Sequence, residues 1–171
     1  METSLRYGGD SKALKIHAKQ KLPLPMVSNA FLQVHGELDT IIGEPSYLCV
    51  MMRCFYPDIL ASLGVGYHHD KRVKLPLSIR GKKAFEVINS DNSALSFNIK
   101  GRCHLDKEFK KRKPRGAAEF SWSILNFQKD QDVRLKLGYE VFDKVPYLQI
   151  RENNWTFNAD MNGKWNVKFD L

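Results

Sequence analysis

A strict two-residue alternation near the start of the chain limits the fold more than any other feature. In residues 12–22, KALKIHAKQKL, basic side chains recur at every second position and most positions between them are apolar. The basic set is Lys15, His17, Lys19 and Lys21. At about 100° per residue a helix would scatter these side chains around its axis, whereas an extended strand places them on one face. The segment therefore predicts a β-strand with one basic and one apolar face.

The same period of two recurs through most of the chain and never changes to 3.6. It is clear in residues 73–80, 94–105, 116–127 and 132–141. Clusters of Gly, Asn, Asp and Pro separate these runs, as turns between strands require. We count about twelve segments, most of them 8 to 12 residues long. Twelve membrane strands of 9 to 11 residues would use about 110 to 130 residues. The pattern predicts an all-β fold, a closed antiparallel transmembrane β-barrel of about 12 strands with a polar, basic lumen.

Length and charge restrict the class of partner. The 171 residues include 27 Lys and Arg against 19 Asp and Glu, giving a formal charge of +8. A single domain over residues 1–171 is expected at this length. The excess of positive charge favours anionic partners, either nucleic acid, lipid headgroups or small phosphorylated solutes. No window reaches the roughly 18 apolar residues of a spanning helix, so a membrane protein of this sequence would have to cross with strands.

Targeting and cysteine content add two further expectations. The start, METSLRYGGDSKAL, has neither the basic and apolar regions of a signal peptide nor the composition of a transit peptide. We therefore expect no secretory entry and no cleaved leader. The three cysteines do not suggest a disulfide framework.

The distribution of charge along the strands predicts which face is wet. Charges within the expected strands are mostly positive, whereas many acids, such as Asp39, Glu44 and Asp58, fall in expected turns. A solvated outer surface usually mixes both signs. The sorting is typical of a positively lined lumen with apolar residues facing lipid. The residues predicted to line the pore and bind anions are Lys15, His17, Lys19, Lys21, Arg80, Lys82, Lys100, Arg102, Arg134, Lys136, Lys164 and Lys168.

One segment lacks alternation and is strongly basic. Residues 106–116, DKEFKKRKPRG, are most simply a solvated surface loop. A nuclear-localisation or nucleic-acid patch is less favoured. The functional interpretation we prefer is a basic loop at a pore mouth, formed by Lys110, Lys111, Arg112, Lys113 and Arg115.

Catalytic and metal-binding motifs are absent from the sequence. There is no GxxxxGK phosphate loop, no HExxH and no CxxC, so we expect no enzyme, no catalytic residue, no metal site and no cofactor. The run His68-His69-Asp70 is more simply a polar turn than a metal site. Two non-membrane alternatives remain. One is a soluble basic β-barrel that binds single-stranded nucleic acid, which would interleave aromatic and basic residues on one face. The other is a lipocalin-like carrier with its apolar faces inward.

The last hairpin allows a register prediction. Trp155, Phe157, Ala159 and Met161 share one face, and the next strand has an apolar face that starts at Trp165. Directly paired residues share a face, so Met161 should oppose Trp165 across a three-residue loop with a glycine bulge.

Long stretches of the chain resemble one known family. They include METSLRYGGDSKALKIHAK, VHGELDT, SLGVGYHHDKR, RGKKAF, FNIKGRC and all of residues 116–167. By these stretches the whole chain resembles the chloroplast outer envelope pore protein 21 family, small β-barrels of the plastid outer membrane. The resemblance implies an anion-selective, rectifying channel of the lipid bilayer that passes phosphorylated carbohydrates such as triose phosphates. It also implies modulation by ATP and by the transported substrates. We expect no nucleic-acid partner, and a homo-oligomer is possible.

Overall fold

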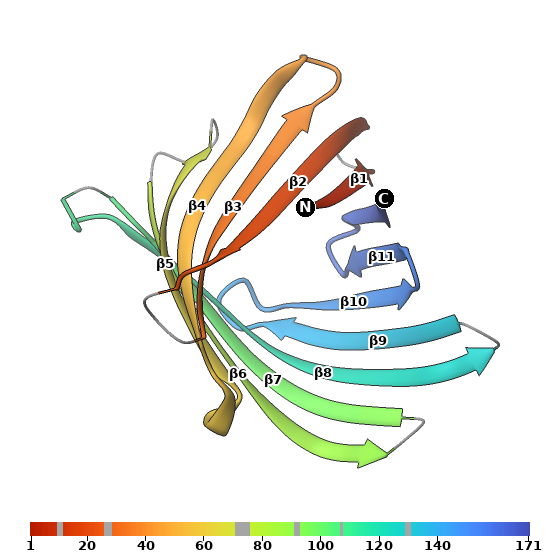
Figure 1. The fold of residues 1–171 in the computed structure, drawn as a ribbon. Coiled ribbons are helices and arrows are strands. Elements are labelled where there is room, and N and C mark those ends of the chain that lie inside the picture. The colour runs from red at the N-terminus through yellow and green to blue at the C-terminus, as the bar shows by residue number, and fades with distance from the viewer. Residues whose placement is uncertain (10–11, 26–28, 71–75, 91–92, 107, 129–130) are drawn as a thin grey trace.

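The computed structural model is a closed antiparallel β-barrel in which each strand pairs with its neighbour in sequence (Figure 1). The structure describes residues 1–171 except 10–11, 26–28, 71–75, 91–92, 107 and 129–130. The strands are β1 (Glu2–Gly8), β2 (Ala13–Pro23), β3 (Ala30–Asp39), β4 (Glu44–Tyr56), β5 (Ala61–Asp70), β6 (Leu77–Ser90), β7 (Ser93–Leu105), β8 (Arg112–Gln128), β9 (Gln131–Glu140), β10 (Val145–Glu152), β11 (Trp155–Asp160) and β12 (Trp165–Asp170). A short 3₁₀ turn, Pro57–Ile59, precedes β5.

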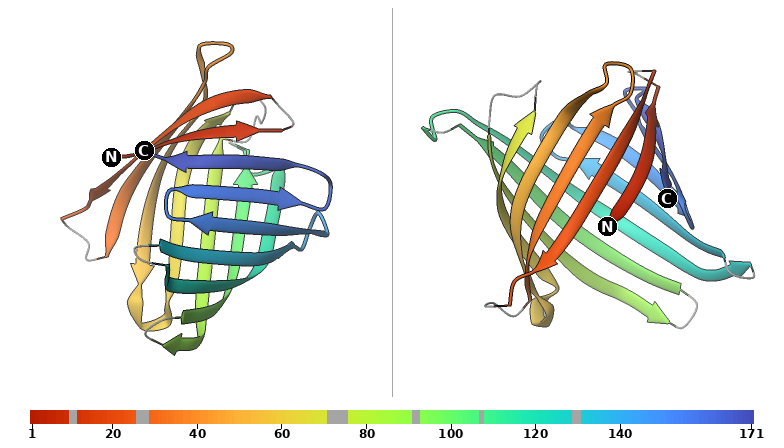
Figure 2. Two further views of the ribbon diagram at one scale, coloured as in Figure 1. Left: turned by 90° about the vertical axis from the view of Figure 1, so that its right-hand side faces the viewer. Right: turned by 45° about the horizontal axis from the view of Figure 1, so that its top comes forward.

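Pairing of the first and last strands closes the barrel. Ser4 of β1 lies opposite Asp170 of β12, and Gly8 lies opposite Asn166. The two chain ends consequently lie side by side (Figures 1 and 2). Closure leaves no unpaired strand edge, which a membrane barrel requires because lipid cannot hydrogen-bond to the backbone. The predicted all-β class and strand number are confirmed.

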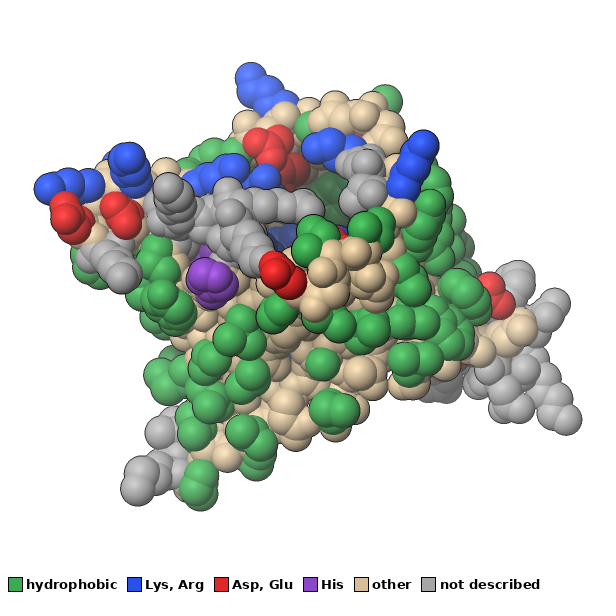
Figure 3. Space-filling model, turned by 90° about the horizontal axis from the view of Figure 1, so that it is seen from above, with side chains coloured by type: hydrophobic (Ala, Val, Ile, Leu, Met, Phe, Trp, Pro, Cys, Tyr) green, Lys and Arg blue, Asp and Glu red, His purple; other side chains and the backbone are tan. Residues whose placement is uncertain are grey.

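Side chains alternate between a polar interior and an apolar exterior. Phe120 and Trp122 of β8 are 55% and 47% exposed, although they are large and apolar. Between them in sequence, Ser121 is buried on the inner face. Figure 3 shows hydrophobic side chains across the outer wall, with Lys and Arg side chains along the rim and in the hollow behind it. The predicted polar, basic lumen is confirmed. The chain does not adopt the lipocalin-like alternative, in which the apolar faces point inward.

The fourth and fifth strands depart from the simple pattern because their inner faces are partly apolar. Cys49 and Met51 of β4 point inward and are 2% and 1% exposed. They fit because the inner positions of β5 are Gly64 and Gly66, and a Cβ at Gly66 would lie against the backbone of Met51. A bulky residue at Gly66 would therefore push the two strands apart.

Strand lengths differ more than the expected 8 to 12 residues. The strands β6, β7 and β8 have 14, 13 and 17 residues, whereas β11 and β12 have six each. At about 3.3 Å per residue, six residues extend only about 20 Å. The long strands β7 and β8 form a hairpin that projects beyond its neighbours (Figure 1). Its outer residues Arg112–Arg115 pair with β7 but lie beyond the end of the β8–β9 pairing at Ala117.

Two local predictions are wrong because the strands continue where a turn or loop was expected. Residues 68–70 belong to β5, with His68 opposite Cys49 and His69 opposite Leu48. The ladder with β4 continues to Asp70 and keeps this polar run extended. Likewise the predicted basic loop becomes strand at Arg112, because Arg112 and Lys113 pair with Leu105 and His104.

The predicted loop of the last hairpin has the right length but the wrong register. Trp165 lies opposite Ala159, not Met161. The Asp160 carboxylate accepts hydrogen bonds from the backbone amides of Asn162 and Lys164, at 2.9 and 3.0 Å. This closes the turn one residue earlier, around residues 161–163, and Gly163 takes the left-handed conformation with φ +77°.

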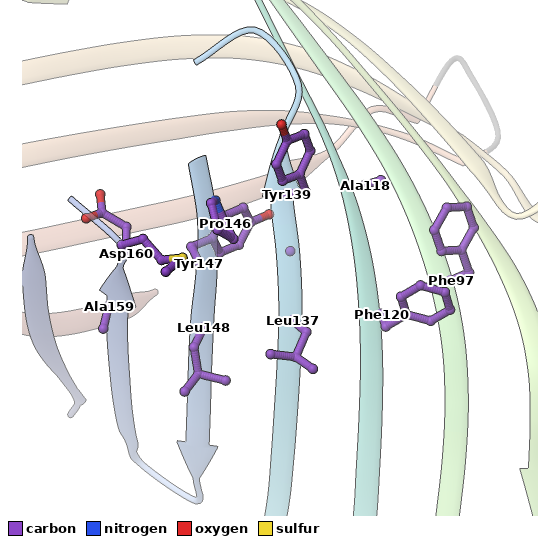
Figure 4. Close-up of a pocket in the computed structure, with 12 residues that line it drawn as sticks. Phe97, Ala118, Phe120, Leu137, Tyr139, Pro146, Tyr147, Leu148, Ala159 and Asp160 are labelled. Atoms are coloured by element: carbon purple, nitrogen blue, oxygen red, sulfur yellow. The ribbon is translucent and has the colours of Figure 1, made fainter. Parts of the chain in front are cut away.

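Two further observations concern the outside of the barrel. Among the described residues, no helix is both long and apolar enough to cross a membrane. A groove of ≈ 570 Å³ lies over β7–β11 where the small residues Ala118 and Ala159 stand between larger side chains such as Phe120 and Leu137 (Figure 4). The groove is apolar because it belongs to the outward face.

Candidate functional site

The interior holds four adjoining cavities that share lining residues. Their volumes are ≈ 390, 280, 490 and 740 Å³. Arg6 lines three of them, and Arg80 and Arg102 each line two. The cavities therefore form one continuous lumen, which we treat as the candidate site.

The structure places nearly all predicted pore-lining residues on these cavities. Lys15, His17, Lys19, Arg80, Lys82, Lys100, Arg102, Arg134, Lys136, Lys164 and Lys168 contribute to at least one lining. Lys21 does not, and its ammonium group instead donates to Glu2 Oε1 at 3.1 Å near the end of β2. Lys164 lies in the turn before β12 rather than within a strand. Their role in anion binding stays a prediction.

Three arginines stand side by side on the long strands of the inner wall. Arg80 of β6 lies directly opposite Arg102 of β7, and Arg102 lies directly opposite Arg115 of β8. All three line both the 390 Å³ and the 280 Å³ cavities. Like charges in direct register destabilise a sheet. We call this set the arginine row, and its unfavourable arrangement indicates a role other than stability.

Carboxylates inside the lumen neutralise part of the basic wall. Glu119 accepts hydrogen bonds from Lys100 at 2.6 Å and from the Tyr147 hydroxyl at 2.5 Å. Glu37 accepts from Lys15 at 2.7 Å and lies 3.2 Å from His17 Nε2. The expectation that acids concentrate in turns is therefore incomplete. The two-residue alternation places Glu119 on the polar face of its strand, but its pairing with Lys100 and Tyr147 depends on contacts with other strands that one segment does not reveal.

Tyr147 reaches Glu119 because the strand between them carries a glycine. Gly138 of β9 lies directly opposite Tyr147 of β10, and Glu119 lies opposite Gly138 on its other side. A Cβ at Gly138 would overlap the Tyr147 ring. The ring thus lies over Gly138 and contacts Lys100, whose ammonium is 5.3 Å from the ring centroid. The result is one compact unit of Lys100, Glu119 and Tyr147.

The short strands carry a neutral inner wall. Gln149 of β10 donates to Asn158 of β11 at 2.6 Å, and Asn158 donates to Asn166 of β12 at 2.9 Å. The three residues are directly paired across the strands. The amide of Asn158 uses both its acceptor and its donor capacity along this line, whereas Gln149 donates and Asn166 accepts. We call it the amide ladder.

The predicted pore-mouth residues divide into two groups. Lys113 and Arg115 line the 390 Å³ cavity from β8. By contrast, Lys110 pairs with Glu108 at the tip of the projecting hairpin and is 79% exposed. Neither Lys111 nor Arg112 lines any of the four cavities. The physical reason is again the alternation of the strand, which turns Lys113 and Arg115 to one face and Arg112 to the other.

Several lumen cations were missed by the sequence prediction. Arg6 follows Ser4 in an alternating β1, and Arg151 follows Gln149 in β10, so the period of two could have found both. Arg53 could not be found in this way, because it follows the apolar inner residues Cys49 and Met51. Arg53 also lines the lumen, and its guanidinium donates to Gln33 and Ser62 at 3.4 Å.

The chemistry of this lumen is electrostatic. Among the residues that the structure describes, no group of three or more His, Cys, Asp and Glu is placed to hold a metal ion. Lys and Arg dominate the linings: Arg6, Lys15, Lys19, Arg53, Arg80, Lys82, Lys100, Arg102, Lys113, Arg115, Arg134, Lys136, Arg151, Lys164 and Lys168. The acids on the same linings are Glu2, Glu37, Glu140, Asp160 and Asp170. Such a wall carries an excess of positive charge, which makes the electrostatic potential in the lumen positive.

Comparison with known proteins agrees with this architecture. The family model described as chloroplast outer envelope pore protein OEP21 matches residues 3–171. The chain belongs to this family. It is 58% identical to outer envelope pore protein 21A, chloroplastic, of Arabidopsis thaliana, over the full length of both chains. It is 56% identical to outer envelope pore protein 21, chloroplastic, of Pisum sativum, and 47% identical to the protein of that name from Oryza sativa subsp. indica, again over the full length of both chains.

Membership of the outer envelope pore protein 21 family settles the environment of the barrel. The chain is a pore protein of the chloroplast outer envelope, and its apolar exterior faces the lipid bilayer. The exposed Phe120 and Trp122 are then lipid-facing residues of a membrane barrel, as the alternation predicted. The lumen is the pore.

Proposed function

We propose that this pore is an anion-selective, rectifying channel that passes phosphorylated carbohydrates such as triose phosphates and is modulated by ATP. The observation that carries the proposal is the arginine row. Arg80, Arg102 and Arg115 lie in direct register and line two adjoining lumen cavities. An anion that enters this section lowers the repulsion among the three guanidinium groups and gains charge-assisted hydrogen bonds.

Phosphate groups suit this wall better than monovalent halides do. A guanidinium group presents a planar pair of donors that matches two phosphate oxygens, and Lys100 and Lys82 add point charges from the next inner positions. Because several such groups line the path, a phosphorylated sugar exchanges one partner for the next. Passage then needs no moving part.

Modulation by ATP follows from the same charges. A triphosphate engages several cations at once, so it leaves the lumen more slowly than a monophosphate and obstructs the flow of smaller anions. The 390 Å³ cavity offers Arg6, Lys15 and the arginine row to such a ligand. We therefore expect block by ATP to weaken when Arg80 or Arg102 loses its charge.

Rectification requires an uneven charge distribution along the pore axis. The β7–β8 hairpin projects on one side and carries Lys110, Lys111 and Arg112 outside the cavities. Neutralising these three residues to Gln should make the current–voltage curve more symmetric. If the current–voltage curve of the variant stays equally asymmetric, the hairpin charges do not cause the rectification.

The experiment that tests the proposal is a reversal-potential measurement on the purified protein in a planar bilayer under a KCl gradient. We expect a reversal potential close to that of chloride. The preference should weaken on going from 0.1 M to 1 M salt, because the screening length falls from about 10 Å to about 3 Å. A cation preference, or none, would refute the proposal.

A further inference from the structure

Most of the histidines of this chain meet on one stretch of the lumen wall. His17 on β2, His35 on β3, His68 on β5 and His104 on β7 all line the 390 Å³ cavity, together with Tyr47 on β4. The five residues come from five different strands and are far apart in sequence. We call them the ring row.

Successive rings of the row contact each other. The rings of His17 and His35 are stacked, with centroids 5.4 Å apart and planes inclined by 25°. Tyr47 lies 5.4 Å from His35 and 6.0 Å from His68. The aromatic surface is therefore continuous across three neighbouring strand pairs.

The row continues from β5 to β7 across the intervening strand β6, whose inner residue next to His104 is small. Ser78 of β6 lies directly opposite His104 and is fully buried. On its other side Ser78 lies opposite Gly66 of β5, two residues before His68. The rings of His68 and His104 meet edge to face, with centroids 4.5 Å apart.

Cations border the row along its length. The Arg80 guanidinium donates to the Tyr47 hydroxyl at 3.2 Å, and Lys15 and Arg102 line the same cavity. A bound divalent cation would have to approach these positive charges, so the row is poorly suited to a metal ion. A negatively charged ligand with a flat ring suits this surface in two ways. Its ring packs on the aromatic side chains, and its charge pairs with Arg and Lys.

We propose that the ring row is a binding site for planar aromatic anions, so that the pore holds an aromatic phosphate more tightly than an aliphatic phosphate of equal charge and size. The ring lies against Tyr47, His35 and His104, which are partly exposed to the cavity, and the phosphate pairs with Arg80 and Arg102. Nucleotides belong to this class of anion. The inference rests on the proposed function, since only an anion-conducting lumen admits such ligands.

The test compares two blockers that differ only in aromaticity. Phenyl phosphate and cyclohexyl phosphate carry the same charge on a six-membered ring, and each is titrated against the chloride current of the full chain in a planar bilayer. We expect phenyl phosphate to block at a concentration about two- to tenfold lower, the range that one aromatic pair contributes. Cyclohexyl phosphate is the more lipophilic of the two, so adsorption to the lipid would reverse this order. Equal block by the two compounds would overturn the inference.

Variants assign the preference to the ring row. Tyr47→Leu and His104→Leu remove a ring and should bring the two blocking concentrations together. Tyr47→Phe keeps the ring and loses only the hydroxyl bonded to Arg80, so it should keep the preference. A preference for phenyl phosphate that persists in both leucine variants would overturn the assignment. If a leucine variant fails to insert, the comparison of the two phosphates on the native chain still decides the inference.

A second pair of readouts separates this inference from the proposed function. Arg80→Gln should weaken block by both phosphates without changing their ratio. The reversal potential of the native chain reports on anion selectivity alone. A chloride-like reversal potential with equal block by the two phosphates would refute the ring row and leave the anion channel standing. A cation-selective native pore would refute both.

Discussion

Two walls of the lumen differ in how their polar residues are satisfied. On the long strands β6–β8, the arginine row places three like charges in direct register. On the short strands β10–β12, the amide ladder links Gln149, Asn158 and Asn166 through two hydrogen bonds of 2.6 and 2.9 Å. The two sets occupy equivalent positions, inward-facing and cross-strand paired, yet one places like charges side by side and the other is joined by hydrogen bonds.

This difference separates stability from function within a single barrel. Neutral amides that satisfy each other hold strands together and present little charge to a passing ion. Guanidinium groups that repel each other lower the stability of their wall. Arg115 lies 3.8 Å from the Asp143 carboxylate, and we propose that an entering anion offsets the remaining repulsion. We infer that the long wall selects ions while the short wall keeps the barrel closed.

Substitutions in the long wall should change the ion selectivity of the pore most. Arg80→Gln with Arg102→Gln should lower the ratio of anion to cation permeability about thirtyfold, because each of the two unit charges contributes about 1 kcal/mol at a few ångströms even in a water-like medium, and about 1.4 kcal/mol is tenfold. Reversal potentials in a planar bilayer measure the ratio. The matched control, Lys15→Gln with Lys19→Gln, removes the same charge, but both lysines are paired with acids, Glu37 and Glu2. It should lower the ratio only about twofold, and an equal loss would show that the arginine row selects ions no better than lysines that are paired with acids.

Removing a lumen carboxylate should raise the anion to cation permeability ratio, by less than the arginine substitutions lower it. Glu119→Gln releases Lys100 from an ion pair of 2.6 Å, adds one net positive charge to the wall and keeps an acceptor for Tyr147. We expect the anion to cation permeability ratio to rise about two- to threefold. Glu108→Gln makes the same change at the exposed hairpin tip, where Glu108 pairs with Lys110, and should leave the ratio unchanged. A fall in anion preference for the Glu119 variant would contradict the electrostatic account.

The amide ladder should affect stability without affecting selectivity. Asn158→Leu breaks both hydrogen bonds of the ladder and should lower the free energy of unfolding by about 1–2 kcal/mol, measured by urea titration of the lipid-reconstituted barrel. The reversal potential should not move. Asn162→Ala is a suitable control, since at that turn it is the backbone amide that bonds to Asp160. A shifted reversal potential in the Asn158 variant would show that the short wall also selects ions.

Alternation made the strands and their polar faces predictable, because a membrane barrel forces every second residue toward water. Lys15, Arg102 and Lys136 could therefore be placed on one face from the sequence alone. The pattern fails at β4, where Cys49 and Met51 are apolar but point inward, packed over the glycines of β5. Local sequence does not reveal that a glycine on the next strand makes room for them.

Contacts between strands set the remaining features. The arginine row depends on the register of β6, β7 and β8, and the ring row depends on the contact between His68 of β5 and His104 of β7. Neither follows from spacing along one segment, because each strand contributes a single member. The turn at residues 161–163 was misplaced for a similar reason, since the Asp160 carboxylate closes it by bonding to the amides of Asn162 and Lys164.

The central claim is that positive side chains facing the lumen determine which ions pass. The most direct test is the reversal potential of the purified native chain in a planar bilayer under a tenfold KCl gradient. The account predicts a value close to the chloride equilibrium potential, which collapses toward zero in the Arg80→Gln, Arg102→Gln variant. A native value near the potassium equilibrium potential would contradict it.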